Sequence, residues 1–500
     1  MLFSLDSATL IGICAVLIKV EIDITPGLPR YAIVGLPDAS AGESFERVWG
    51  ALRNSGIPTP IKHITVNLAP GDIRKEGTRF DLAIALGIAA SSCEETDTDI
   101  NPDRFKDLLI LGELAMDGSV RPVRGVLPSL LEAKKAGIHE ALVPWDNAQE
   151  AALVEGMRIL PASTLLEAMR LLAGISQPRP IVTATEIRKD YEYDLSLVKG
   201  QFLAKRALEI CAAGGHHLLF FGPPGSGKTL LARCLPSILP QLSHEHALEA
   251  AAVRSIAKGR TCELSFVPPF RSPSQNISLA GLIGSYTPGE ISLAHRGVLF
   301  IDEFPEFKKN CLEALRAPLE GGTLEIARAK FHTEYPCSFT LVAAMNPCPC
   351  GYYGDKSKEC LCTAPQRAKY IRKLSGPLLD RIDLQVRVSR PEPEELVEMT
   401  SGESSDTVRE RVEAAAEMQK ARGCVNGRMT PRETRKFCCP DTETRHFMTR
   451  ALKHLSLSAR VYDRVLRVAR TIADLAGKEK IELADVCEAL EYRALERAAE

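Results

Sequence analysis

The segment with the clearest chemical signature is a glycine-rich octapeptide that ends in a lysine and a threonine. It follows an apolar strand predicted over His217–Phe221 and reads Gly222-Pro223-Pro224-Gly225-Ser226-Gly227-Lys228-Thr229. Glycines let the backbone curl so that its N–H groups face phosphate oxygens. We expect Lys228 to neutralise the β- and γ-phosphates of a nucleotide and the Thr229 hydroxyl to ligate Mg²⁺. The alternative is a glycine- and proline-rich turn that binds nothing.

Two carboxylates end the next apolar stretch. The run Gly297–Ile301 is typical of a strand buried in a parallel sheet, and Asp302 and Glu303 follow it directly. The carboxyl ends of parallel strands lie at the edge where ligands bind. We therefore expect Asp302 to hold the Mg²⁺ ion through water and Glu303 to polarise the water that attacks the γ-phosphate. An apolar run ending in Asp-Glu is also common as a purely structural feature.

Two further polar side chains lie next to predicted strands. Asn346 ends the apolar stretch Phe339–Met345, where its amide can orient the same water or the γ-phosphate, although an asparagine before a proline also forms turns. Arg381 lies between a predicted helix and the strand Leu384–Val388. An arginine in that place can supply positive charge to a phosphoryl transition state in a neighbouring subunit. The alternative is a surface ion pair between Arg381 and Asp380.

Four cysteines form a compact group shortly after Asn346: Cys348, Cys350, Cys360 and Cys362. Four thiolates satisfy tetrahedral Zn²⁺, and Gly351 and Gly354 allow the chain to fold back between the two pairs. Because no histidine or open ligand position is nearby, we expect a structural zinc site. The Cys-x-Cys spacing is tighter than that of a standard zinc finger. A reducible disulfide pair and reduced thiols without a metal are the alternatives.

The elements that position these residues fall into three predicted regions, the number expected for 500 residues at about 150 residues a domain. Strict alternation of apolar and polar residues over Ile18–Thr25 belongs to an α+β domain at residues 1–172. A linker with Pro178 and Pro180 follows at 173–195, and an α/β region at 196–390. Helical spacing predicts a helical domain at 391–500, with helices over 394–400, 408–421, 441–454, 458–476 and 483–499.

The overall composition limits the function classes. Lys and Arg number 62 and Asp and Glu number 64, so the formal net charge of −2 excludes a uniformly basic nucleic-acid coat. The apolar run Ala8–Ile18 is followed by Lys19 and lacks a positive leader, so neither a signal peptide nor a membrane span is expected. Most of the 15 cysteines are single residues in apolar segments, as in reduced proteins. We therefore expect a cytoplasmic protein without a membrane partner.

The charge is unevenly distributed along the chain. Lys and Arg outnumber Asp and Glu by 12 to 4 over Arg422–Arg470 and by 9 to 4 over Asp355–Arg390. In the first block Arg460, Arg464 and Arg467 recur at helical spacing and share one face, which suits solvent, a nucleotide or DNA. Aromatic residues make up 6% of the chain and are not interleaved with the basic segments, so no base-stacking surface is expected.

The order of these motifs resembles that of AAA+ ATPases of the magnesium-chelatase-like branch, and in particular the ComM/YifB family. The resemblance is carried by Pro269–Pro273, Ala280–Gly284 and, most specifically, Pro288–Phe307, and it extends from residue 1 to residue 500. It implies a P-loop AAA+ core, a C-terminal helical lid and an N-terminal Lon-protease-like (S5-like) α+β domain. In one departure, Ser274 and Gln275 stand where the family usually has two histidines, so those histidines' role is not carried over.

The resemblance also implies a role for each candidate site residue. Lys228 and Thr229 correspond to the Walker A pair and Asp302 and Glu303 to the Walker B pair, with ATP and Mg²⁺ as the implied cofactors. The remaining correspondences are sensor 1 for Asn346, the arginine finger for Arg381 and sensor 2 for Arg460.

The N-terminal region resembles a Lon protease domain that lacks the catalytic residues. In Lon proteases a serine nucleophile and a lysine base form a dyad. The matching segments are Lys75–Asp81, which places Arg79 at the nucleophile position, and Val123–Leu127, which places Leu127 at the position of the base. Thr78 lies next to the first position without a base on the matching strand. We therefore expect no proteolysis, and a docking role toward a protein partner or substrate.

As a member of this family, the chain is expected to be an ATP-hydrolysing motor that forms a hexameric ring with ATP sites between subunits. The resemblance implies action on single-stranded or branched DNA, through branch migration or helicase activity in homologous recombination and natural transformation. One alternative is a chaperone-like motor that acts on a protein through residues 1–172. Another is a metal-insertion motor like magnesium chelatase, against which the Lon-like domain and the cysteine group argue.

Overall fold

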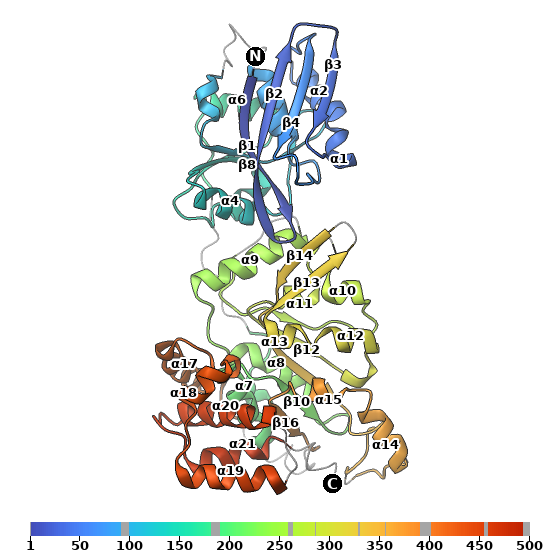
Figure 1. Ribbon diagram of the computed structural model, residues 1–500, viewed down its shortest axis with the longest axis vertical. Helices are drawn as coiled ribbons and strands as arrows, with labels where there is room; N and C mark the ends of the chain where they lie inside the picture. The colour runs from blue at the N-terminus through green and yellow to red at the C-terminus, as the bar shows by residue number, and fades with distance from the viewer. Residues whose placement is uncertain are drawn as a thin grey trace.

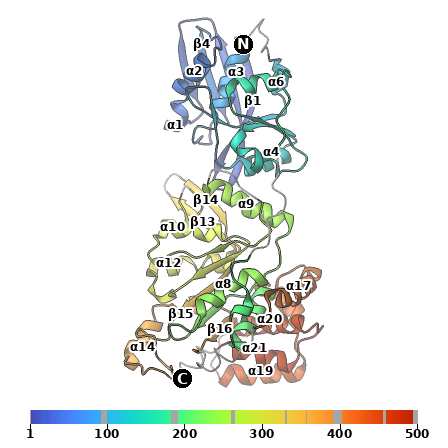
Figure 2. The ribbon, with the colours of Figure 1, turned by 180° about the vertical axis from the view of Figure 1, so that it is seen from behind.

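The computed structural model describes residues 2–91, 100–181, 191–258, 264–285, 287–328, 331–355, 357–390, 402–454 and 459–493. A first domain lies at one end of an elongated molecule, an α/β region occupies the middle, and the C-terminal helices lie beside that region toward the other end (Figures 1 and 2). Within these ranges, no helix combines the length and the apolar composition that a bilayer crossing requires.

The first domain is built on a seven-stranded mixed sheet with the order β3-β4-β2-β1-β5-β8-β9. Its strands are β1 (Leu2–Ile11), β2 (Cys14–Thr25), β3 (Arg30–Val34), β4 (His63–Ala69), β5 (Leu108–Ile110), β8 (Glu140–Pro144) and β9 (Arg158–Ala162). A small hairpin, β6 (Glu113–Leu114) and β7 (Val120–Arg121), lies outside this sheet.

One face of the sheet carries the core of the first domain. The alternation predicted in β2 is confirmed, because Ile18, Val20, Ile22 and Ile24 are all buried. They share a cluster with α2 (Ser44–Asn54), α3 (Asp81–Ala90) and α6 (Leu165–Leu172), and every residue of α3 is buried. The other helices of the domain are α1 (Ala39–Gly42), α4 (Val126–Lys135) and α5 (Ala148–Ala151).

The middle region contains a five-stranded parallel sheet with the order β11-β12-β15-β10-β16. Its strands are β11 (Phe270–Arg271), β12 (Val298–Ile301), β15 (Thr340–Met345), β10 (Leu218–Phe221) and β16 (Leu384–Arg387). The sheet is buried on both faces, as its continuous apolar runs indicate. Phe220 belongs to a core shared with α7 (Phe202–Gly214) and α8 (Lys228–Ile238), and Leu219 belongs to the core on the opposite face.

Several short elements complete the middle region. Its other helices are α9 (His244–Lys258), α10 (Leu279–Ile283), α11 (Glu290–Leu293), α12 (Lys309–Ala314), α13 (Pro318–Gly321), α14 (Ala364–Ile371) and α15 (Gly376–Leu379). An antiparallel hairpin that the sequence patterns did not predict, β13 (Thr323–Arg328) and β14 (Phe331–Pro336), lies toward the first domain (Figure 1).

The first domain packs against the middle region at two places. At the β1–β2 turn, a Cβ on Gly12 would lie 1.8 Å from Cγ2 of Thr333 in β14, so only glycine fits this approach. Helix α4 packs on α9, where the Gly125 N–H donates to the Ser255 carbonyl oxygen at 3.4 Å. Ala251 of α9 joins the apolar cluster of the first domain.

The C-terminal region is helical, and its described helices are α17 (Ser405–Arg422), α18 (Pro431–Phe437), α19 (Thr442–His454), α20 (Ala459–Leu475) and α21 (Leu483–Glu491). The helix predicted over 394–400 lies outside the described residues. The helix predicted over 483–499 is too long, because α21 ends at Glu491. Just after this end, the Gln385 N–H donates to the Tyr492 carbonyl oxygen at 2.6 Å, and Arg493 forms a β-bridge with Gln385.

Candidate nucleotide site

The glycine-rich loop leads from β10 into α8, which begins at Lys228. Gly225 and Gly227 have φ values of 78° and 88°, a left-handed conformation that glycine adopts without strain. A Cβ on Gly222 would lie 2.0 Å from the Val388 carbonyl oxygen, so this position also requires glycine. The Lys228 ammonium donates to the Gly222 carbonyl oxygen at 2.8 Å. It is enclosed by the loop, where burial lowers its pKa to about 8.

Thr229 and Asp302 come together from the start of α8 and the end of β12. The Thr229 hydroxyl donates to Asp302 Oδ2 at 2.9 Å, and both side chains are half-buried. A hydroxyl and a carboxylate are oxygen ligands of the kind that Mg²⁺ prefers. The donor set therefore fits the ion that the sequence predicts, with Thr229 and Asp302 as the residues that would hold it.

Glu303 is exposed and has a φ of 50°, which is unusual for a residue other than glycine. Its N–H donates to Asp302 Oδ1 at 2.9 Å, which fixes the turn after β12. Holding a residue in this backbone conformation costs about 1–3 kcal/mol of free energy, and such residues concentrate at functional sites. The geometry places the Glu303 backbone directly beside the Asp302 carboxylate.

Asn346 follows β15, which lies between β12 and β10 in the sheet. Its Oδ1 is 3.4 Å from the Lys228 ammonium. Because the three strands are parallel, their carboxyl ends meet at one edge, and the side chains that follow them converge. The structure thus brings together Lys228, Thr229, Asp302 and Asn346, as the sequence predicts.

Arg381 and Arg460 lie elsewhere in the chain. Both line a cavity of about 1230 Å³ that Lys228, Thr229 and Asp302 do not line. Arg381 is 7% exposed and forms an ion pair of 2.7 Å with Glu320, so the alternative pairing with Asp380 is wrong. Within one chain, the two arginines are therefore not part of the phosphate-binding cluster.

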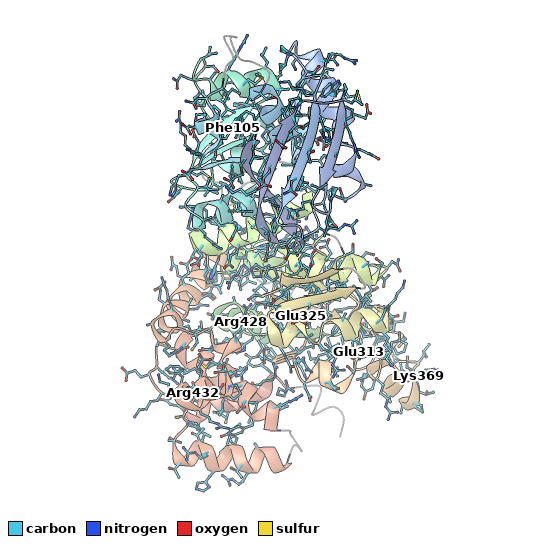
Figure 3. The ribbon with its side chains drawn as sticks, turned by 45° about the horizontal axis from the view of Figure 1, so that its top comes forward. Phe105, Glu313, Glu325, Lys369, Arg428 and Arg432 are labelled. Atoms are coloured by element: carbon cyan, nitrogen blue, oxygen red, sulfur yellow. The ribbon has the colours of Figure 1, made fainter. Side chains whose placement is uncertain are left out.

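The same cavity collects further arginines from the C-terminal helices. Arg464 and Arg467 of α20 line it beside Arg460, which confirms that the three share a face. Arg464 donates to Asp383 Oδ1 at 2.6 Å, and the positive charge of Arg464 lowers the pKa of that buried carboxyl. Arg428 also lines the cavity where the C-terminal helices meet the middle region (Figure 3). Arg428 belongs to the basic block Arg422–Arg470, and its position at this cavity was not predicted from the sequence.

Part of the basic block Arg422–Arg470 is neutralised or buried. Arg422 and Arg470 both form ion pairs with the buried Asp474. Arg464 and Arg467 of the block are half-buried, whereas Arg428 is exposed to solvent at the cavity. Most of the other described cations of this block are exposed, among them Arg432, Arg435, Lys436, Arg445 and Arg450.

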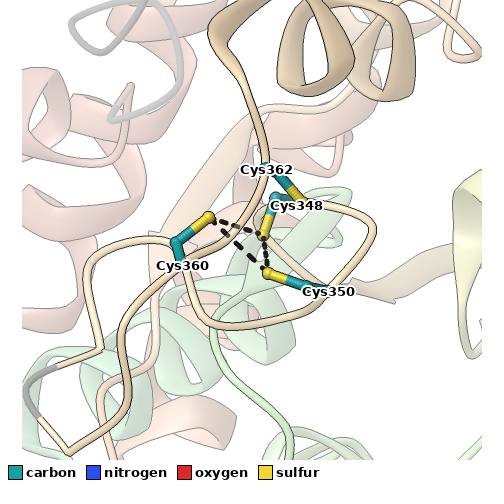
Figure 4. Close-up of side chains that lie close together, drawn as sticks. All are labelled: Cys348, Cys350, Cys360 and Cys362. Carbon is teal, nitrogen blue, oxygen red and sulfur yellow. Dashed lines mark hydrogen bonds between the residues drawn. The ribbon is translucent and has the colours of Figure 1, made fainter.

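The four clustered cysteines also meet in space, as Figure 4 shows. Their sulfur atoms all lie within 4.8 Å of one another, and Cys348 Sγ is 3.3 Å from Cys350 Sγ and 3.6 Å from Cys360 Sγ. A tetrahedral zinc ion with bonds of about 2.3 Å requires sulfur atoms about 3.8 Å apart. All four are free thiols, so the disulfide alternative does not apply here. The donor set fits Zn²⁺.

The loop between the cysteines favours the thiolate of Cys350. Gly351 and Gly354 adopt φ values of 87° and 73°, so the predicted turn positions do bend the chain back. A hydrogen bond from the Tyr352 N–H lowers the pKa of the Cys350 thiol to about 6. A thiolate is the form that binds a metal.

In the first domain, the two segments that resemble a protease site do meet. The buried Arg79 guanidinium donates at 2.6 Å to the carbonyl oxygen of Arg124, which lies in the segment Val123–Leu127. The Thr78 hydroxyl donates to the Glu113 carboxylate, a partner that the sequence analysis missed. Neither Arg79 nor Leu127 can act as the nucleophile or base of a Ser–Lys dyad.

Comparison with family models places three modules along the chain. The model for the magnesium chelatase subunit ChlI matches residues 194–396, and its C-terminal model matches 402–493. A model described as a subunit ChlI of Mg-chelatase matches residues 20–147. The first domain therefore does not by itself argue against a chelatase-like protein, which corrects the expectation stated above.

Two relatives match over nearly their full length. The uncharacterized protein YifB of Escherichia coli is 42% identical over 496 residues, which cover 97% of this chain and 96% of YifB. The competence protein ComM of Haemophilus influenzae is 42% identical over 505 residues, with the same shares covered. Lon protease 2 of Bacillus subtilis is 30% identical over 128 residues, or 25% of this chain and 22% of the protease. The chain belongs to the ComM/YifB family of magnesium-chelatase-like AAA+ proteins.

Proposed function

We propose that this protein hydrolyses ATP in a hexameric ring and uses the energy to move DNA strands, by branch migration or helicase activity during recombination of incoming DNA. The observation that carries the proposal is the convergence of Lys228, Thr229, Asp302 and Asn346 at one edge of a parallel sheet. The similarity to a competence protein supports DNA as the substrate.

Each residue of the cluster has a place in phosphoryl transfer. Lys228 binds the β- and γ-phosphates, and Thr229 and Asp302 hold Mg²⁺. When bound, the ion would neutralise negative charge on the phosphate oxygens. Glu303 accepts a proton from the attacking water, and the Asn346 amide orients that water beside the γ-phosphate.

The position of the two remaining arginines supports the proposed ring. Arg381 and Arg460 line a cavity away from their own phosphate loop, so we place them against the nucleotide of a neighbouring subunit. A head-to-tail interface closes into a ring when the rotation between neighbouring subunits divides a full turn, and we propose that six subunits do so here. ATP then binds between subunits, and its hydrolysis changes their relative position.

We further propose that the cysteine cluster holds a structural Zn²⁺ ion. Its four thiols leave no open coordination position for a water or substrate. The ion would fix the loop that follows Asn346 and would take no part in hydrolysis.

The proposal is tested by migration of a four-way DNA junction with ATP. The wild type should move the junction, and Glu303→Gln should bind the junction without moving it. ATP hydrolysis by the wild type with neither junction movement nor stimulation by DNA would overturn DNA as the substrate.

A motor that acts on a protein is the second candidate, and one observation favours it. Leu28 and Ile61 are 87% and 79% exposed and precede the paired strands β3 and β4 at the edge of the first domain. Exposed apolar residues of this kind suit a protein partner. Hydrolysis that is insensitive to DNA in the junction experiment would favour this function.

A further inference from the structure

The loop that carries the cysteine cluster and the helix that follows it form an exposed basic surface, which we call the knuckle face. Its exposed or half-exposed side chains are Tyr353, Lys358, Leu361, Arg367, Lys369 and Arg372. Tyr353 is 49% exposed and Leu361 is 86% exposed. Among the described residues, no acidic side chain forms an ion pair with any of the four cations. The same loop carries the exposed Glu359 and the partly exposed Asp355, so the four cations leave the knuckle face with net positive charge beside exposed apolar groups.

Aromatic rings and cations alternate on this surface. The Lys358 ammonium lies 4.3 Å from the centre of the Tyr352 ring, and the Arg367 guanidinium lies 4.3 Å from the centre of the Tyr353 ring. Tyr352 and Tyr353 precede the basic segment Asp355–Arg390 in the sequence, and the fold places their rings beside two of its cations. The sequence separates Tyr353 from Arg367 by many residues, and the fold of the cysteine loop brings them together. Mixed aromatic and cationic surfaces suit a nucleic-acid strand, since phosphates pair with cations and bases stack on rings.

The knuckle face is attached directly to the candidate nucleotide site. Arg390 donates to the Pro224 carbonyl oxygen of the phosphate loop at 3.0 Å and to the Ser357 hydroxyl at 2.9 Å. A Cβ on Gly351 would lie 2.9 Å from Pro224 Cδ, so the cysteine loop also packs closely on the phosphate loop. A displacement of the phosphate loop will therefore be transmitted to the knuckle face.

The basic surface of the C-terminal helices differs in both position and availability. Lys369 lies on the opposite side of the middle region from the C-terminal helix that carries Arg432 (Figure 3). Several arginines of the C-terminal block are enclosed or paired, as with Arg422 and Arg464. Lys369 and Arg372 of the knuckle face are exposed and unpaired among described residues, whereas only part of the C-terminal block, including Arg435 and Lys436, is exposed.

From these relationships we infer that the knuckle face binds a DNA strand through its phosphodiester backbone and couples that contact to the phosphate loop. The inference rests on the proposed DNA motor and names its contact surface. Lys369 and Arg372 contact phosphates, and Tyr353 and Leu361 contact sugars or bases. The cysteine cluster holds the loop in the shape that places these side chains together.

The test is a double charge reversal, Lys369→Glu with Arg372→Glu, measured by fluorescence anisotropy on labelled oligothymidine and on duplex DNA. The matched control is Arg435→Glu with Lys436→Glu, which reverses two exposed cations on α18 of the C-terminal region. We expect the knuckle variant to bind single-stranded DNA at least about tenfold more weakly than the control. Its salt dependence should be shallower by about 1.4 in log–log slope, which corresponds to two lost phosphate contacts.

Basal ATP hydrolysis without DNA should be unchanged in the knuckle variant, while its stimulation by DNA is lost. The zinc content of the variant, compared with that of the wild type, confirms that the cysteine loop is intact. Equal affinity of the knuckle variant and the wild type overturns the inference but leaves the DNA motor standing. An equal loss of DNA affinity in the knuckle variant and the control variant also overturns the inference, because the loss would then reflect the net charge of the protein and not this surface. A wild type that does not bind DNA overturns the proposed function itself.

Discussion

Arg381 forms an ion pair with Glu320 of its own chain, with 2.7 Å between Nη2 and Oε1. The Arg381 side chain is largely buried, whereas about half of the Glu320 side chain is exposed. Nε of Arg381 is buried and has no hydrogen-bond partner among the described residues. Water around the exposed half of Glu320 screens the attraction between the two charges, and the proposed role of Arg381 requires the phosphate of a docked subunit to replace Glu320. On the proposed role of Arg381 in a neighbouring subunit's site, this ion pair is the resting position of the guanidinium.

Action of Arg381 on a neighbouring subunit predicts complementation between inactive chains. Arg381→Ala and Lys228→Ala should each abolish most ATP hydrolysis, by a factor of about 10³ for the arginine. In an equal mixture, about a quarter of the interfaces combine an intact Lys228 with an intact Arg381, because interfaces form at random. Hydrolysis should therefore recover to a corresponding fraction of the wild-type rate.

The control for this mixture combines two lesions of the same phosphate site, Lys228→Ala and Glu303→Gln. No interface in that mixture contains an intact site, so hydrolysis should not recover. Recovery in the control, or no recovery in the first mixture, would contradict the placement of Arg381.

Glu303 and Glu306 both follow β12, but their substitution should have sharply different effects on ATP hydrolysis. Glu303→Gln should lower ATP turnover by about 10²–10⁴ while ATP still binds, because the amide cannot accept a proton. Glu306→Gln is the matched control, since Glu306 pairs with Lys373 at 3.0 Å on the exposed surface. Turnover and nucleotide binding measured on both variants decide the assignment. Equal loss of turnover in the two variants would refute a specific role for Glu303.

The phosphate cluster was predictable because each of its residues follows a short motif with a fixed meaning. An apolar strand that ends in a polar residue places that residue at the ligand edge of a parallel sheet, whichever order the strands take. Lys228, Asp302 and Asn346 therefore converge even though more than a hundred residues separate the first from the last. Local pattern and sheet geometry are sufficient for this part of the site.

The rest of the site depends on contacts between distant elements that no local pattern encodes. Glu320 reaches Arg381 because α13 packs near the turn that follows α15, and Arg428 lines the cavity because of how the C-terminal helices dock. The stacking of Arg367 on Tyr353 depends on the fold of the cysteine loop. The helix predicted to reach Ala499 ended early because Tyr492 hydrogen-bonds to Gln385 of β16, a tertiary contact that overrides helical spacing.

The affinity for ATP should fall as the pH rises above about 8. Burial lowers the pKa of Lys228 to about 8, so the free protein loses the ammonium charge above that pH. Binding of the phosphates requires the charged form, and affinity should fall by about tenfold per pH unit until the pKa in the complex is reached. Titration with a fluorescent ATP analogue from pH 7 to about 9.5 measures the change. Lys228→Met should bind weakly without this pH dependence, and a constant wild-type affinity would refute the prediction.

Purified protein should contain about one zinc per chain, because four thiols within 4.8 Å of one another match tetrahedral coordination. Cys350→Ser removes one ligand and should lower the zinc content and the melting temperature together, since metal binding contributes to folding. Cys439→Ser is the control, an exposed cysteine outside the cluster, and should keep both at the wild-type level. Elemental analysis decides the matter: wild-type protein with less than about 0.2 zinc per chain, its thiols kept reduced during preparation, does not have this site.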